Sequence, residues 1–196
     1  MAEWNSSITG PGELLFADIQ AGAVLIPTRI VIGTGSMPSG SGPADMTGVV
    51  TPLKSIAVSE RKRTPDGMCI FGGVWTNADI NQEFYYRECA LYARAEYRDA
   101  KGSVVRSVAE VCMIYCNSGS TAEKIPAYKG GSTLIERVPR IPCAVGGDAV
   151  VEMTLESGIY ATKEELEAAT VMTDGATSKK YTWGIENGLV YIKEVE

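Results

Sequence analysis

The chain has 196 residues and a formal net charge of −6, with 45% hydrophobic and 21% charged residues. This length predicts one domain, or one with a small appendage, and the apolar content suffices for a core. The acidic balance argues against nucleic acid as a partner, and the absence of histidine excludes His-dependent triads, His-ligated metals and His pH switches.

The N-terminus has the features of neither a signal peptide nor a membrane span. It begins with an acidic residue and has no apolar run before its turn residues. The longest apolar runs, 23–26 and 30–32, are far shorter than the roughly 20 residues that cross a bilayer. We therefore expect synthesis in the cytosol and no membrane insertion.

The first elements are a helix and a strand. Apolar residues between Leu14 and Ile19 follow a short amphipathic pattern bounded by glycines, which predicts a helix over 12–22. The β-branched run 24–35 predicts a strand whose N-terminal part lies at a sheet edge or is irregular because of Pro27. The Gly/Ser/Pro-rich segment 35–43 predicts a loop.

Three extended segments, 55–63, 68–77 and 84–98, predict a meander, with a turn at 64–67. The third segment alternates with a period of two, which predicts one buried and one solvated face. The residues expected to be buried are Tyr85, Cys89, Leu91, Ala93 and Ala95, and those expected in solvent are Glu88, Arg94, Glu96 and Arg98. A turn at 99–102 and the strand 103–116 complete a hairpin.

The remaining segments alternate between connectors and short elements. We expect a polar loop over 117–132, an edge or connector over 136–145 because of Pro139 and Pro142, and a strand over 148–157. Thr162 and Glu165 form a capping box, which predicts a short helix over 161–172. The Asn187-Gly188 pair predicts a terminal hairpin over 180–196, which needs an apolar partner surface because a lone hairpin is marginal in water.

No catalytic, metal or cofactor site is expected. The five cysteines are interpreted as reduced, buried thiols, and Cys112 and Cys116 lie about 13 Å apart on one strand, too far for a disulfide. Gly33 and Gly35 start a dinucleotide-like fingerprint that fails at Pro38.

Strand-borne carboxylates and aromatics have a stronger structural than functional interpretation. Glu88, Glu96 and Glu110 lie on predicted strands. Glu88 and Glu96 share a face with Arg94 and Arg98, which favours a solvated surface with cross-strand ion pairs. Seven aromatic side chains could stack on sugars, although packing is favoured over binding. These are Tyr85, Tyr86, Tyr92, Tyr97, Tyr181, Trp183 and Tyr191.

The expected fold is α+β, mainly antiparallel β, with an N-terminal helix, a short C-terminal helix and a terminal β-hairpin. Residues 1–158 are expected to form the main domain, 159–178 a short helix and linker, and 179–196 the hairpin. A chain cut after Gly158 is expected to stay folded.

Several segments resemble the N-terminal, baseplate-attachment domain of phage tail-collar or tail-fibre proteins. They are residues 4–35, FYYRECALYA at 84–93, the segment 119–126 and VVEMTLES at 150–157, in the family's order and spacing. The most specific is an aromatic-Arg-Glu-x-x-Leu-aromatic-Ala motif, to which we assign a structural role. Its members are Tyr86, Arg87, Glu88, Leu91, Tyr92 and Ala93.

The resemblance implies a structural component of a contractile phage tail or phage-tail-like particle, located in the virion or particle and assembled in the host cytoplasm. Its expected partners are baseplate proteins and a distal fibre or receptor-binding protein, and it is expected to be a homotrimer without enzymatic activity. Candidate docking residues are Trp4, Asn5, Leu14 and Phe16, and candidate trimer or partner contacts are Leu166, Trp183, Ile185, Leu189 and Tyr191. The alternative is a small carbohydrate-binding module that recognises a surface glycan.

Overall fold

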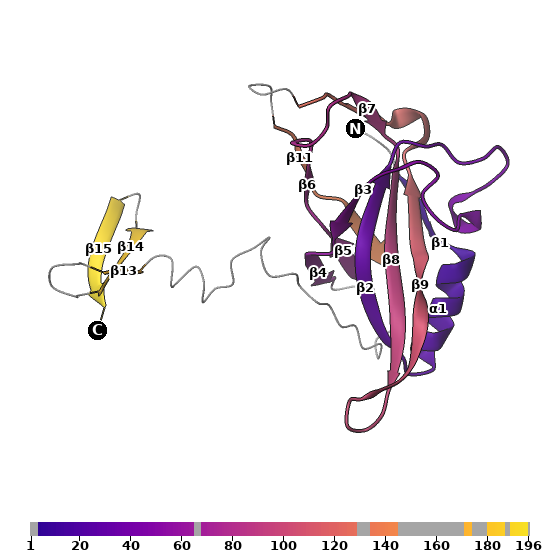
Figure 1. Cartoon of the computed structure of the whole chain (residues 1–196), viewed down its shortest axis with the longest axis horizontal. Coiled ribbons are helices and arrows are strands. Elements are labelled where there is room, and N and C mark those ends of the chain that lie inside the picture. Colours follow the sequence, from indigo (N-terminus) through magenta and orange to yellow (C-terminus); the bar gives the residue numbers. More distant parts are fainter. Residues whose placement is uncertain are drawn as a thin grey trace. The chain divides into compact units, whose positions relative to one another are not determined.

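The computed structural model describes residues 4–64, 68–128 and 134–144, and the backbone of 171–173, 180–186 and 189–195. The fold is α+β and mainly antiparallel β, with one helix near the N-terminus (Figure 1). The chain divides into two compact units, Met1–Leu155 and Glu156–Glu196. No helix among the described residues is long and apolar enough to cross a membrane.

The first unit is built on a five-stranded antiparallel sheet, the main sheet. In spatial order its strands are β1 (Asn5–Ile8), β9 (Val104–Asn117), β8 (Glu88–Arg98), β2 (Val24–Gly33) and β3 (Pro52–Ala57). The predicted hairpin of β8 and β9 is confirmed. Its turn is held by Asp99 Oδ1, which accepts hydrogen bonds from the backbone N–H groups of Lys101 and Ser103 at 2.9 Å.

The expectation for Pro27 is also confirmed. The β2–β8 register shifts between Pro27 and Arg29, and β3 pairs with β2 only from Arg29 onward. The N-terminal part of β2 therefore has a free side on which a residue without N–H is tolerated.

Helix α1 (Gly10–Gln20) begins two residues earlier than expected. Thr9 is its N-cap: Thr9 Oγ1 accepts a hydrogen bond from Gly12 N at 3.0 Å and donates one to the carbonyl of Cys112 at 2.5 Å. Pro11 lies in the first turn, where its missing N–H costs nothing. A Cβ at Gly12 would lie 2.2 Å from the Met113 carbonyl oxygen, so glycine permits this close approach of helix to strand.

The predicted meander is wrong. β4 (Glu60–Arg63) and β5 (Cys69–Gly72) form a hairpin, but β3 pairs with β2, and β8 pairs with β2 and β9. The alternation indicated which segments are extended, but it carries no information about which strand pairs with which. The long β8 pairs with the other long strands of the fold.

Several short strands complete this unit. β12 (Arg140–Cys143) pairs with β5 to give a second sheet in the order β12-β5-β4, which confirms the expected edge over 136–145. Two-stranded pairs join β6 (Trp75–Thr76) to β11 (Glu136–Arg137) and β7 (Phe84–Tyr86) to β10 (Glu123–Ile125). The 3-10 turns η1 (Pro43–Asp45) and η2 (Gly119–Thr121) lie in loops. β10 and η2 fall in the segment 117–132 that was expected to be a loop.

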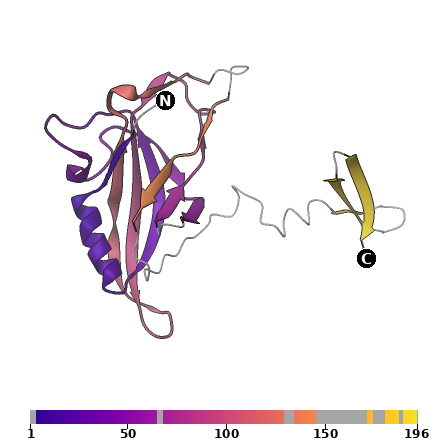
Figure 2. The ribbon, with the colours of Figure 1, turned by 180° about the vertical axis from the view of Figure 1, so that it is seen from behind.

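Two hydrophobic clusters lie on the main sheet. The larger one includes Leu15 of α1, Leu91 of β8, and Phe71 and Ile141 of the second sheet. Figure 2 shows the ribbons of α1 and the second sheet against the main sheet. The smaller cluster contains Met46, Ala90, Cys112 and Tyr115 and is flanked by Met37 and Val49 of the loop that follows β2. The two faces of the sheet are therefore covered differently.

The second unit contains β13 (Val171–Thr173), β14 (Lys180–Glu186) and β15 (Leu189–Val195) in an antiparallel sheet of that order. The predicted terminal hairpin is confirmed by the β14–β15 register from Lys180–Val195 to Glu186–Leu189. The predicted strand 148–157 lies outside the described residues. So does the predicted helix 161–172 except for Val171 and Met172, which lie in β13.

Candidate functional site

The family-like motif spans the junction of β7 and β8. β7 ends at Tyr86 and β8 begins at Glu88, so Arg87 interrupts the extended chain. Tyr86 belongs to the larger hydrophobic cluster, whereas Glu88 contacts the loop on the other face. The alternation of buried and exposed side chains starts anew after this break. For this reason Tyr85, which was expected to be buried with Cys89, is 45% exposed.

Glu88 is fully buried, and the expectation that it lies on a solvated surface is wrong. Its Oε1 accepts from Gly35 N at 2.5 Å and Thr51 N at 3.1 Å, and its Oε2 accepts from Val50 N at 2.7 Å and the Tyr115 hydroxyl at 2.8 Å. Four donors satisfy the buried carboxylate, as such a charge requires. Glu88 therefore fastens both ends of the loop that covers this face.

Other motif residues also serve the fold. Leu91 and Ala93 are completely buried in the larger cluster. Tyr92 is half-buried beside the smaller cluster, and the Arg29 guanidinium lies over its ring at 4.4 Å. Arg87 lies over the ring of Tyr85 at 5.0 Å. The structural role assigned to the motif agrees with these contacts.

The other two strand carboxylates form ion pairs. Glu110 binds Arg29 at 2.7 Å, and the hydrogen bond from Arg29 lowers the pKa of Glu110. Glu96 binds Arg98 at 3.0 Å and also pairs with Arg94, and these hydrogen bonds lower its pKa. Glu96 is only 7% exposed, so the expectation that it lies in solvent is wrong, and its two arginine partners come from its own strand and not from a neighbouring one.

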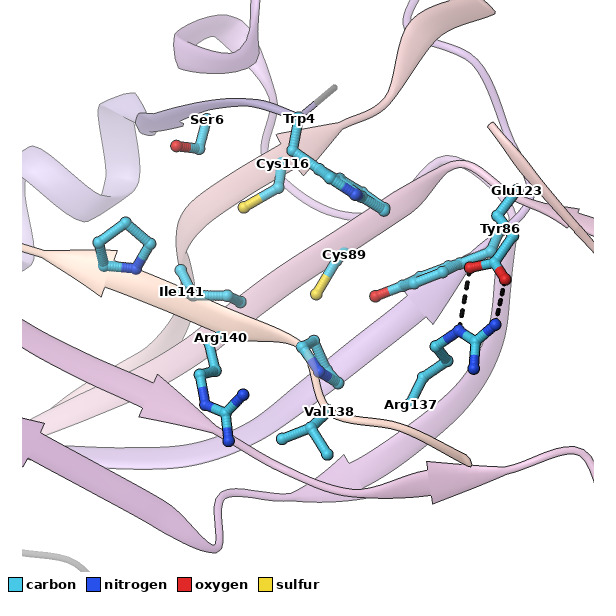
Figure 3. A pocket seen from close by; sticks show the side chains of 12 residues that line it. Trp4, Ser6, Tyr86, Cys89, Cys116, Glu123, Arg137, Val138, Arg140 and Ile141 are labelled. Carbon is cyan, nitrogen blue, oxygen red and sulfur yellow. Dashed lines mark hydrogen bonds and ion pairs between the residues drawn. The ribbon is translucent and has the colours of Figure 1, made fainter. Parts of the chain in front are cut away.

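A cavity of about 400 Å³, here the Tyr86 pocket, opens between the main sheet and β12 (Figure 3). Ser6, Cys116 and Cys89 are cross-strand neighbours on β1, β9 and β8 and form a row along its floor. Trp4 and Tyr86 lie beside this row with ring centroids 4.9 Å apart. The rest of the lining comes from Glu123 and from Arg137, Val138, Pro139, Arg140, Ile141 and Pro142.

The polar groups of the Tyr86 pocket are uncharged or paired. Burial raises the pKa of Cys89 to about 12 and raises the pKa values of Cys116 and Tyr86 well above their ordinary values. All three are therefore neutral at physiological pH. Arg137 forms an ion pair with Glu123, and Arg140 Nε lies 2.8 Å from Glu60 Oε2, so both cations at the rim are compensated.

The candidate docking residues do not form one surface. Trp4 is 37% exposed and lines the Tyr86 pocket, with the exposed Asn5 next to it at the start of β1. Leu14 is 73% exposed on α1, outside this pocket, and Phe16 is half-buried against the core. Of the four, Trp4 lines the Tyr86 pocket. The sequence names Tyr86, Cys89 and Cys116 for other reasons, but it does not show that they meet Trp4 at one cavity, because the lining residues come from strands distant in sequence.

The four described tyrosines of the aromatic set are each buried or packed against an arginine. Tyr86 is buried, and arginines cover one face of Tyr85, Tyr92 and Tyr97. The Tyr97 hydroxyl also donates to Asp18 at 2.7 Å. Trp183, Ile185, Leu189 and Tyr191 lie on β14 and β15, whose backbone alone is described, and Leu166 lies outside the described residues. Their interface role stays a prediction.

All five cysteines are buried and free, as expected. The structure adds two cross-strand pairs that sequence spacing could not reveal, Cys89 with Cys116 and Cys69 with Cys143. Among the described residues, no three His, Cys, Asp or Glu side chains come together as metal ligands would.

The chain was compared with protein-family models, with curated proteins and with solved structures. None of these comparisons finds a match.

Proposed function

We propose that this chain is a structural component of a phage or phage-tail-like contractile particle. In this role it is a short tail-fibre or collar protein that docks on the baseplate and links it to a distal fibre or receptor-binding element. The proposal begins from the resemblance of about residues 4–158 to the attachment domain of tail-collar proteins. It includes a homotrimer, a location in the particle and the absence of enzymatic activity.

The observation that carries the proposal is the position of Trp4. This candidate docking residue stands partly exposed at the Tyr86 pocket, where its ring packs against Tyr86, the first residue of the family-like motif. A half-exposed tryptophan over an apolar cavity is a common feature of protein interfaces. The rest of the motif is used in packing and in fastening a loop, as befits a scaffold.

The separate C-terminal unit supports the linking role. A three-stranded sheet of short strands has little surface for a core of its own, so it is suited to pack on copies of itself or on a neighbouring protein. The division of the chain near residue 155 fits a docking body followed by an assembly element. Light scattering on the purified chain tests the trimer directly.

Purification of particles from the producing strain tests the function. We expect the chain in intact sheathed tails, and a Trp4→Ala chain to be incorporated at least tenfold less while its melting temperature stays unchanged. Leu14→Ala is the matched control, because Leu14 is exposed outside the pocket. Absence of the chain from particles, together with saturable binding on a glycan array, would replace this proposal by the carbohydrate-binding alternative.

A further inference from the structure

The sheets that face each other in the first unit differ in width. The main sheet has five strands, and the second sheet has three, in the order β12-β5-β4. β12 is the edge of the second sheet in the part of the chain that the structure describes. The Tyr86 pocket lies beside β12 and over the row of Ser6, Cys116 and Cys89 (Figure 3). A fourth strand next to β12 would cover this row.

The backbone of β12 can accept such a strand. Gly73 N donates a hydrogen bond to the carbonyl of Pro139. In the register of this pair, the backbone N–H and C=O groups of Ile141 and Cys143 therefore also point toward β5. Because this direction alternates along a strand, Val138, Arg140 and Pro142 direct theirs toward the pocket. Pro142 has no backbone N–H, so it leaves no unpaired donor on this side of β12. An added strand would therefore meet three carbonyl acceptors and the N–H groups of Val138 and Arg140.

The chemistry of the pocket favours an uncharged occupant. Its floor and walls are aromatic, aliphatic and thiol groups, and both rim arginines already bind glutamates. The raised pKa values of Cys89, Cys116 and Tyr86 indicate that the cavity disfavours negative charge. A carboxylate entering it would be desolvated without a free cation to pair with.

We propose that the Tyr86 pocket binds an extended, uncharged segment of a partner polypeptide. The segment adds to the side of β12 on which no described strand lies, as a fourth strand, and places one apolar side chain over Ser6, Cys116 and Cys89. This inference rests on the proposed docking function and names the chemistry of the partner. A polypeptide is preferred to a small molecule because the backbone edge supplies hydrogen bonds that only another backbone matches in register.

The test is a titration of the full chain with a capped, uncharged heptapeptide, acetyl-TVTFTVT-amide, followed by NMR. We expect saturable shifts of the Val138 and Arg140 amides and of the Trp4 indole. The same peptide with N-methyl groups on alternate residues is the control, because it cannot pair with an edge. We expect it to bind at least tenfold more weakly, and a peptide with Asp in place of the central Phe to bind at least tenfold more weakly as well.

A matched pair of variants locates the site. Ser6→Phe places a ring on the floor of the pocket from an exposed position and should reduce binding at least tenfold without a change in melting temperature. Ser39→Phe makes the same change in an exposed loop and should leave binding unchanged. Equal binding to both variants would overturn the assignment.

Other occupants give different results, each of which overturns the proposal. N-acetyl-phenylalaninamide that binds as tightly as the heptapeptide would indicate a small-molecule site. A full chain that binds only after Val151→Asp and Met153→Asp would indicate that its own residues 148–157 compete for the edge. The proposed function can fail independently of the peptide site. If the chain binds the peptide but is absent from particles, the peptide site stands and the role in a phage-tail-like particle is wrong.

Discussion

Tyr86 and Glu88 stand two residues apart and belong to opposite faces of the main sheet. On the Glu88 face, a buried carboxylate binds four donors and fastens a long loop, so each of its oxygens is already used. On the Tyr86 face, the described cover is narrower than the sheet, and a cavity of about 400 Å³ lies beside β12, the edge of the second sheet among the described strands. The comparison teaches that neighbouring residues of one motif can fasten a loop on one face of a sheet and line a cavity on the other.

Glu88→Ala should release the loop from the Glu88 face of the main sheet, and it gives the largest expected effect. Removing the carboxylate leaves the N–H groups of Gly35, Val50 and Thr51 and the Tyr115 hydroxyl without their acceptor. We expect a loss of about 4 kcal/mol in the free energy of unfolding. Urea denaturation measures it, with Glu83→Ala as control, because the exposed Glu83–Lys124 pair should contribute no more than about 0.5 kcal/mol. Equal losses would contradict the role of Glu88.

Gly35→Ala tests the same contact from the loop, because Gly35 N donates a hydrogen bond to Glu88. A Cβ at Gly35 would lie 2.4 Å from Glu88 Oε1 and 2.9 Å from Thr51 N, so the carboxylate or the loop must move. We expect a loss of about 2–3 kcal/mol in the free energy of unfolding. Gly10→Ala is the matched control, since a methyl group added at Gly10 would have no neighbouring atom within 4 Å. A stable Gly35→Ala protein would mean that the loop is not held closely.

Thr9→Val tests the link between β9 and α1. The change keeps the shape of the buried side chain but removes the hydroxyl that caps the helix and binds the Cys112 carbonyl. We expect a loss of about 1–2 kcal/mol by thermal or urea unfolding. Thr9→Ser retains the hydroxyl, so its free energy of unfolding should be close to that of the wild type. A Thr9→Ser protein no more stable than Thr9→Val would show that packing of the methyl group dominates.

Alkaline pH should weaken the fold through its buried thiols. Burial raises the pKa values of Cys89, Cys112 and Cys143 to about 12, from an ordinary value of 9.0. Because the unfolded thiols lose protons first, the stability contributed by the buried thiols is complete only well below pH 9, begins to fall as the pH approaches 9, and continues to fall as the pH rises toward 12. Between pH 7 and 9 we expect a loss of about 1 kcal/mol in the free energy of unfolding. Cys112→Ala should reduce this loss, and stability that rises over this interval would contradict it.

The sequence predicted the local structure better than the assembly of strands. The α1 segment, the β8–β9 hairpin and the terminal hairpin follow from periodicity and turn residues, which act over a few positions. Strand pairing depends on contacts distant in sequence, so the meander was wrong. The burial of Glu88 was missed because a glutamate on an alternating strand looks like a solvated residue until the loop donors are known. Of the pocket, the sequence indicated only Trp4 as a docking residue.

Amide hydrogen exchange on the wild-type chain and on Glu88→Gln tests the difference between the two faces most directly. We predict that the Gly35, Val50 and Thr51 amides are protected in the wild type and lose protection together in Glu88→Gln, because an amide cannot accept all of their hydrogen bonds. The Ile141 amide, on the other face, should keep its protection. Fast exchange of the three loop amides in the wild type, or an equal loss at Ile141, would contradict the account.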